Sequence, residues 1–353
     1  MLRGETKRIY VGGVPLGGGA PVSVQSMTNT KTEDVVATAA QIRSLEESGC
    51  DIVRVAVPGL EAARAIRELK KMARIPIVAD IHFDYKLALE SIESGADKIR
   101  INPGNIGGDE RVKAVALAAK ARGIPIRVGV NGGSVPRDLL ERFGAPVPQA
   151  LVETALREIR QLERYDFTDI CVAVKSSNAA DTYEAYRLLS ERCAYPLHIG
   201  VTEAGTSYSG IIRSAVGIGG ILLAGIGDTI RVSLTADPIE EIRAGIEVLK
   251  AAGLREQGLR IISCPSCGRC GIDLIKTAMR VEDALSGANR SITVAVMGCE
   301  VNGPGEARQA DYGLAGGKSG GVLFKKGEII GRAPAEGLAE ALIEIIESES
   351  GVQ

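Results

Sequence analysis

A strand–helix unit recurs about every thirty residues along most of this 353-residue chain, and it constrains the fold more than any other feature. Short segments rich in β-branched residues alternate with amphipathic segments, and Gly or Pro stands before most of the strands. The strands are apolar almost throughout, as expected when helices cover both faces of a parallel sheet. They span residues 22–27, 51–57, 75–82, 98–103, 124–130, 169–175, 197–203 and 229–235. Eight such units predict a (β/α)8 TIM barrel rather than an open doubly wound sheet.

The repeat begins after a predicted hairpin at residues 8–17 and stops near residue 255. We therefore predict a TIM-barrel substrate-binding domain at residues 1–255 and a small α+β domain at residues 256–353. The expected elements of the second domain are a strand at 260–263, a helix at 272–285, a strand at 292–297, two strands joined by the turn at 325–328, and a helix at 335–348.

Cationic side chains interrupt five of the apolar strands. They are Arg54, Arg100, Arg127, Arg231 and Lys175. A cation in a strand covered on both faces is costly unless a carboxylate or a bound anion compensates it. Ion pairs with Asp80, Asp97 or Glu203 are one explanation. Five cations against few inward acids favour the other, a pocket at the carboxyl ends of the strands that binds a phosphorylated substrate, and we expect a diphosphate.

Further polar residues fall at the same strand ends. The candidate substrate-binding residues are Asp80, His82, Asn102, Asn131 and Ser233. Glu203, at the end of the seventh strand, is the best-placed carboxylate for proton transfer, with a counter-ion to an arginine as the alternative. Lys175 raises a rival activity, because a lysine in apolar surroundings can form a Schiff base with a carbonyl substrate.

Composition excludes several classes of function. The formal net charge is −2 and aromatic residues make up 3% of the chain, so we expect no nucleic-acid partner. No long apolar segment suggests a membrane span, and the N-terminus lacks the apolar core of a signal peptide, so we expect a cytoplasmic protein without a membrane partner. The two histidines are too few for a His-rich metal site.

Four of the seven cysteines lie in two short segments of the second domain. Cys264, Cys267 and Cys270 have the spacing C-x2-C-x2-C, and Cys299 follows about thirty residues later. Thiolates at this spacing suit either a zinc knuckle or an iron–sulfur cluster. A disulfide is disfavoured in an intracellular protein. The remaining cysteines, Cys50, Cys171 and Cys193, are expected to be small buried side chains.

The order of the domains predicts an association of two copies. The eighth helix returns the chain to the end of the barrel opposite the cationic pocket. A strand spans ~17–20 Å, too far for an electron donor on the opposite face to touch substrate. A closed head-to-tail homodimer, in which the second domain serves the partner's barrel, is the simplest solution.

The chain resembles the IspG (GcpE) family of 4-hydroxy-3-methylbut-2-en-1-yl diphosphate synthases of the methylerythritol phosphate pathway of isoprenoid biosynthesis. The segments that carry the resemblance are Val24-Gln25-Ser26-Met27-Thr28, Ala79-Asp80-Ile81-His82-Phe83, residues 98–105, residues 264–269 and residues 298–306. The resemblance implies a TIM barrel followed by an iron–sulfur domain, with a [4Fe–4S] cluster bound by Cys264, Cys267, Cys299 and Glu306. It also implies a reductive ring opening of 2-C-methyl-D-erythritol 2,4-cyclodiphosphate, with ferredoxin or flavodoxin as electron donor.

Within this interpretation Glu203 and Glu306 are the catalytic candidates, and the cationic residues bind the diphosphate. A carboxylate ligand is harder and more exchangeable than thiolate, so Glu306 could give way to a substrate oxygen. Cys270 stands where the family pattern has no ligand and could coordinate in place of Glu306, although the Gly303-Pro304-Gly305 turn favours Glu306. Two alternatives remain: a Schiff-base lyase with a structural zinc domain, and an electron carrier with an inert barrel.

Overall fold

The computed structural model describes residues 1–353 except 257, 286–290, 300–308, 318 and 351–353. The chain forms two compact units, Met1–Arg255 and Glu256–Gln353, and each is described by itself. No helix among the described residues has both the length and the apolar character needed to cross a membrane.

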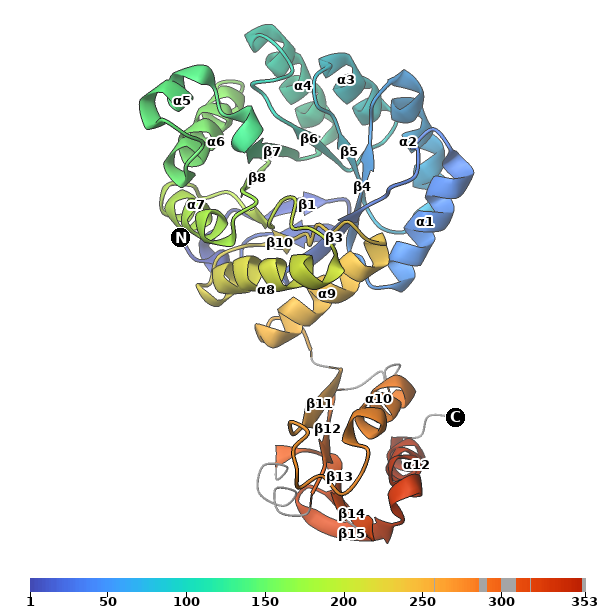
Figure 1. The fold of residues 1–353 in the computed structure, drawn as a ribbon. Helices are drawn as coiled ribbons and strands as arrows, with labels where there is room; N and C mark the ends of the chain where they lie inside the picture. Colours follow the sequence, from blue (N-terminus) through green and yellow to red (C-terminus); the bar gives the residue numbers. More distant parts are fainter. Residues whose placement is uncertain (257, 286–290, 300–308, 318, 351–353) are drawn as a thin grey trace. The chain divides into compact units, whose positions relative to one another are not determined.

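The first unit is the predicted eight-stranded parallel barrel (Figure 1). Its strands are β3 (Ser23–Met27), β4 (Ile52–Ala56), β5 (Ile77–Asp80), β6 (Lys98–Ile101), β7 (Ile126–Asn131), β8 (Ile170–Lys175), β9 (His198–Ile199) and β10 (Thr229–Ile230). They pair in the order β8-β7-β6-β5-β4-β3-β10-β9. A single bridge between Val172 and Leu197 joins β8 to the β9 side, so the barrel is nearly closed.

Helices surround the barrel and pack their apolar faces on the outer side of the strands. They are α1 (Val35–Glu47), α2 (Leu60–Met72), α3 (Tyr85–Glu93), α4 (Asp109–Arg122), α5 (Arg137–Phe143), α6 (Pro148–Glu163), α7 (Ala179–Arg192), α8 (Ser207–Leu223) and α9 (Pro238–Ala251). The short α5 was not predicted. It is a seven-residue helix between β7 and α6, ended by Gly144 in the left-handed conformation.

The seventh and eighth barrel strands are much shorter than predicted, with two residues each. The apolar pattern continues beyond them, but the backbone leaves the ladder. Gly200 lies so close to the carbonyl oxygen of Arg231 that a Cβ there would be 2.5 Å away. An apolar sequence pattern indicates that residues are buried, and burial continues here. It does not show that residues pair with a neighbouring strand, and here they do not.

The predicted N-terminal hairpin closes the amino-terminal end of the barrel. Its strands are β1 (Ile9–Val11) and β2 (Val14–Leu16), paired antiparallel. Ile9, Val11 and Leu16 are fully or almost fully buried against Ile52, Val78 and Cys171, which lie near the starts of barrel strands. Burying a side chain of this size contributes about 1.5–3 kcal/mol, so the hairpin is an integral part of the barrel core.

The second unit is a five-stranded mixed sheet with two helices on one face. Its elements are β11 (Leu259–Ser263), α10 (Leu274–Leu285), β12 (Ile292–Met297), β13 (Tyr312–Gly317), β14 (Gly320–Lys325), β15 (Glu328–Ala333) and α12 (Leu338–Ser350). The order is β11-β12-β13-β14-β15, with the first three parallel and the last two antiparallel. Strand β13 was missed because three of its six residues are glycines. Gly313 is needed where it stands, since a Cβ there would lie 2.3 Å from the Phe324 ring.

We predict that removing the buried hydroxyl of Tyr186 destabilises the barrel at its weakest seam. Tyr186 on α7 donates to the carbonyl oxygen of His198 at 2.5 Å and accepts the Val174 N–H at 3.2 Å, so it links β8 with β9. Tyr186→Phe should lower the free energy of unfolding by about 1–3 kcal/mol, because it leaves buried backbone groups unpaired. Tyr183→Phe, at an exposed position of the same helix, is the control. Equal urea midpoints for the two variants would contradict the prediction.

Candidate functional site

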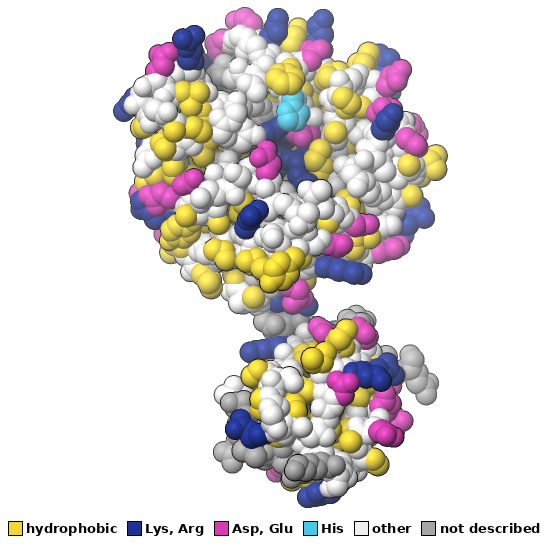
Figure 2. Space-filling view, viewed as in Figure 1, with side chains coloured by type: hydrophobic (Ala, Val, Ile, Leu, Met, Phe, Trp, Pro, Cys, Tyr) yellow, Lys and Arg dark blue, Asp and Glu magenta, His cyan; other side chains and the backbone are white. Residues whose placement is uncertain are grey.

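A pocket of about 230 Å³ lies at the carboxyl ends of the barrel strands. Nine of the residues predicted from the sequence line it: Arg54, Asp80, His82, Arg100, Arg127, Asn131, Lys175, Arg231 and Ser233. Figure 2 shows cationic and acidic side chains inside a hollow in this face of the barrel, beside a histidine. The strands therefore bring together most of the candidate substrate-binding residues.

Strand register explains why these side chains converge. Asp80 on β5 is the direct partner of Arg100 on β6, and Arg100 is the partner of Arg127 on β7. Side chains of paired residues in neighbouring parallel strands point to the same side of the sheet. The side chains of Asp80, Arg100 and Arg127 therefore lie side by side on the same face of the sheet.

Asp80 is the acidic centre of the pocket. Its carboxylate lies 3.1 Å from the Arg100 guanidinium, 3.8 Å from that of Arg54 and 3.4 Å from the His82 imidazole. Burial acts to raise the pKa of Asp80, but Arg54, His82 and Arg100 together hold it well below its usual range. Asp80 is therefore ionised and orients two of the arginines.

Glu241 compensates a third arginine, and the sequence analysis missed it. This buried carboxylate on α9 lies 3.4 Å from Arg231 and also accepts hydrogen bonds from the Ser26 hydroxyl and the Leu234 N–H. Glu241 lies in a segment whose pattern is that of an ordinary amphipathic helix, so nothing in the sequence marked it as a partner of Arg231. Of the acids that were considered, Asp97 pairs with Lys70 instead, at 2.6 Å.

Arg127 and Lys175 have no carboxylate partner among the described residues. Arg127 is 2% exposed and donates to the Gln25 side-chain oxygen at 2.8 Å. Burial lowers the pKa of Arg127 to about 10, and Arg100 adds to the shift. Burial also lowers the pKa of Lys175 well below its usual value, with further contributions from Arg127 and Arg231. The pocket thus gathers five basic side chains around the carboxylate of Asp80, with Glu241 paired to Arg231 outside the lining, which suits a polyanionic ligand.

Two glycines make room for these cations. A Cβ at Gly129 would lie 2.7 Å from the Arg100 Nε, and a Cβ at Gly200 would lie 2.7 Å from the Lys175 Nζ. Any side chain at either position would displace a cation from the pocket. Neither glycine was singled out in the sequence, because such close approaches exist only in the folded barrel.

Two predicted residues do not line the pocket. Asn102 is 3% exposed and lies outside the lining. Glu203 is exposed and has a left-handed backbone conformation with φ of 53°, next to Thr202, which does line the pocket. A non-glycine residue in this conformation is uncommon and marks a strained segment at the edge of the site.

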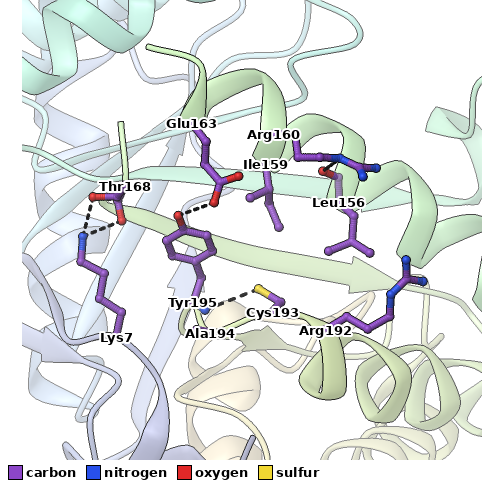
Figure 3. A pocket seen from close by; sticks show the side chains of 10 residues that line it. All are labelled: Lys7, Leu156, Ile159, Arg160, Glu163, Thr168, Arg192, Cys193, Ala194 and Tyr195. Carbon is purple, nitrogen blue, oxygen red and sulfur yellow. Dashed lines mark hydrogen bonds between the residues drawn. The ribbon is translucent and has the colours of Figure 1, made fainter. Parts of the chain in front are cut away.

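A larger depression of about 610 Å³ lies between α6, α7 and the N-terminal segment (Figure 3). Its polar groups already pair with protein groups. Lys7 donates to Thr168 and Asp169, and Tyr195 donates to Glu163 at 2.8 Å. It is also remote from the strand ends at which barrel enzymes place their chemistry. The smaller cationic pocket is therefore the better candidate.

The cysteines of the second unit follow the ends of two neighbouring parallel strands. Cys264 comes directly after β11, and Cys299 comes two residues after β12. The Gly298 N–H donates to the Cys264 sulfur at 3.3 Å. Cys267 is exposed, and all seven cysteines are free thiols. Soft thiol donors around one loop region fit an iron–sulfur centre or zinc in donor type.

Cys270 lies beside the same residue, Gly298, and packs in the same apolar cluster as Cys264. Its sulfur packs on Gly298, where a Cβ would be only 2.1 Å away, and it contacts the apolar core beneath α10 and α12. Among the described residues no three His, Cys, Asp or Glu side chains form a metal-binding group. Glu306, the predicted fourth ligand, lies outside the described residues.

Comparison with known proteins agrees with this architecture. The family model "GcpE TIM-barrel domain" matches residues 6–246, and "GcpE protein C-terminal domain" matches residues 260–348. Among solved structures, dihydropteroate synthase from Yersinia pestis superposes with a TM-score of 0.51 at 13% identity, over 70% of this chain and 100% of that one. At this identity the likeness supports the barrel fold alone.

Curated relatives match the chain over nearly its full length. A protein from Ruminiclostridium cellulolyticum is 57% identical over 98% of both chains, and one from Clostridium tetani is 55% identical over 99% of this chain and 100% of its own. A protein from Geobacter sulfurreducens is 53% identical over 98% of both. All three are named 4-hydroxy-3-methylbut-2-en-1-yl diphosphate synthase (flavodoxin). With a cationic barrel pocket, a cysteine-bearing second unit and both domain models matched, the chain belongs to the GcpE family.

Proposed function

We propose that this protein is a 4-hydroxy-3-methylbut-2-en-1-yl diphosphate synthase. It opens the ring of 2-C-methyl-D-erythritol 2,4-cyclodiphosphate by a two-electron reduction, with loss of water. The observation that carries the proposal is the buried cationic pocket in which Arg127 and Lys175 have no carboxylate partner among the described residues. The names of the relatives agree with this activity and not with a Schiff-base lyase.

The pocket residues have separate tasks in this proposal. Arg54, Arg100 and Arg231 are oriented by carboxylates and present guanidinium groups to the diphosphate. Arg127 supplies uncompensated positive charge, and Lys175 adds to it when the bound anion raises its pKa. Asn131, Ser233 and His82 add polar contacts along the wall of the pocket.

Glu203 is the proposed proton donor for the departing hydroxyl group. It is exposed at the rim, and its strained backbone is held between Thr202 of the pocket wall and Gly205, which also has a positive φ. A carboxyl group at this edge can reach substrate while exchanging protons with water.

The thiols of Cys264, Cys267 and Cys299, together with Glu306, would hold a [4Fe–4S] cluster. The donor types fit, because soft thiolates follow adjacent strand ends and the Gly298 N–H already bonds to one sulfur. When bound, the cluster supplies the two electrons one at a time. We propose flavodoxin as the electron donor, following the printed names of the relatives.

A homodimer completes the proposed enzyme, and α8 offers a surface for it. Apolar side chains of α8 are exposed along one side: Tyr208, Ile212, Val216 and Leu223. Figure 2 shows apolar side chains gathered over this part of the barrel. Arg213 is the one charged residue within the helix. An apolar helix face of this kind typically marks a protein–protein contact.

The first prediction from the proposed function concerns Lys175. Lys175→Met should weaken binding of the cyclic diphosphate by about 10- to 100-fold, because a charge-assisted hydrogen bond contributes about 1.5–3 kcal/mol. Since burial depresses the pKa of Lys175, an anionic ligand should raise it, and binding should take up a proton that the variant does not. Calorimetry in buffers of different ionisation enthalpy measures both effects. Lys113→Met, on the exposed surface of α4, is the control. Unchanged affinity in Lys175→Met would refute the role.

The second prediction separates Cys270 from the cluster ligands. Cys270→Ala should keep the iron and sulfide content and the visible absorption of the anaerobically purified protein, because the proposed ligands are Cys264, Cys267, Cys299 and Glu306. Cys267→Ala should lose them, because it removes a thiolate ligand. Loss of iron in Cys270→Ala would show that a closed all-thiolate site is correct.

The third prediction concerns α8. Ile212→Glu combined with Val216→Glu should convert a dimer to a monomer in light scattering, because it places charge on the apolar contact. Val36→Glu, at a more exposed valine of α1, should remain dimeric. A dimer that survives the α8 substitutions would place the interface elsewhere.

A further inference from the structure

Glu158 is a buried carboxyl group that contacts a loop at the pocket edge and that the proposed mechanism does not use. It lies on α6 and is 4% exposed. Its Oε1 accepts the N–H of Gly104 at 3.3 Å, and its Oε2 is buried without a hydrogen-bond partner among the described residues. Gly104 belongs to the loop that follows β6, the strand that carries Arg100.

Asn102 presents a second unsatisfied oxygen to the same place. Its Oδ1 is buried and has no donor among the described residues. Both this oxygen and the Glu158 Oε1 lie 3.2 Å from the point where a Cβ of Gly104 would be. Two acceptors facing one small space repel each other if the carboxyl is ionised. If Glu158 carries a proton, its carboxyl group becomes a hydrogen-bond donor and the Asn102 oxygen can accept from it.

We propose that Glu158 is a positioning residue whose protonated carboxyl group donates to Asn102, accepts from Gly104, and thereby holds the 102–105 loop at the pocket edge. This gives Asn102 a role that fits its burial outside the pocket lining. The loop continues directly from the strand of Arg100, whose guanidinium is held by Asp80 and by the carbonyl oxygen of Gly129. The role of Glu158 in holding the loop does not depend on the proposed function. The choice of a diphosphate as the ligand of the neighbouring pocket does.

The electrostatic surroundings support a protonated Glu158. Burial raises its pKa to about 8, and the Gly104 N–H and the positive charge of Arg100 oppose the shift only in part. Helix α6 packs against α4, α5, α7, β7 and β8, and among the described residues Arg100 is the one charged group whose field affects Glu158. Burial lowers the pKa of Lys98 on β6 to about 8 as well. A pH profile of the wild-type protein alone therefore does not show whether Glu158 or Lys98 is titrating.

Linkage gives the first test. Because the folded-state pKa of Glu158 is above its ordinary value of 4.5, folding favours the proton, and stability falls as pH rises from about 4.5 to about 8. Glu158→Gln keeps the shape and removes the titration. The melting temperatures of the wild type and of this variant should converge near pH 5 and diverge by several degrees near pH 8, with the variant higher. Glu163→Gln, at the exposed end of the same helix, should follow the wild type. Parallel profiles for wild type and Glu158→Gln would overturn the proposal.

The second test examines the loop itself in the anaerobic holoenzyme. Glu158→Leu should speed hydrogen exchange at the Gly104 amide and weaken binding of inorganic pyrophosphate, each by about tenfold, because the amide loses its acceptor. Glu158→Gln should preserve both at pH 7. Unchanged exchange and affinity in Glu158→Leu would refute the positioning role. If the wild type does not bind pyrophosphate, the proposed ligand is wrong, and the exchange measurement still decides the role of Glu158.

Discussion

The buried positive charge at the carboxyl end of the barrel is the interaction on which the rest of the site depends. Four guanidinium groups and one amine meet where the strands leave little room for water. Such an arrangement is unfavourable unless acids or a ligand compensate it. Asp80 and Glu241 compensate part of the charge. The remainder is available to a polyanion, so the proposed affinity for a diphosphate would arise from charge that the fold leaves uncompensated.

The barrel tolerates this charge because its other end is well packed. The β1–β2 hairpin seals the amino-terminal end with apolar side chains, and the residues that line the cationic pocket lie at the opposite end of the strands. The helices bury the outer faces of the strands. Glycines at 129 and 200 then allow two cations to lie directly on the strand backbone. Apolar packing that stabilises the barrel thus lies at one end of the strands and the candidate binding site at the other, as is typical of TIM barrels.

The proposed division of labour between the two units follows from donor chemistry. The first unit offers hydrogen-bond donors and positive charge, and the second offers thiols after adjacent strands. Neither set alone performs a reductive elimination on a diphosphate. Cys270 shows the limit of spacing as a guide, because it has the spacing of a ligand and its side chain also packs in the apolar cluster beside Gly298. Local sequence spacing could not separate these two roles.

The sequence by itself determined the barrel, the strands that carry the five cations and the two cysteine segments. Periodicity, charge in apolar strands and thiol spacing are local properties that can be read along the chain. Only the tertiary structure decided which groups pair with the cations, because Arg127 meets Gln25 inside the closed barrel and Arg231 meets Glu241 only when α9 packs back on the strands. It likewise decided the short β9 and β10, the glycine-rich β13, and the burial of Asn102 and Glu158 on either side of Gly104. These features depend on distances between distant segments, which no local pattern contains.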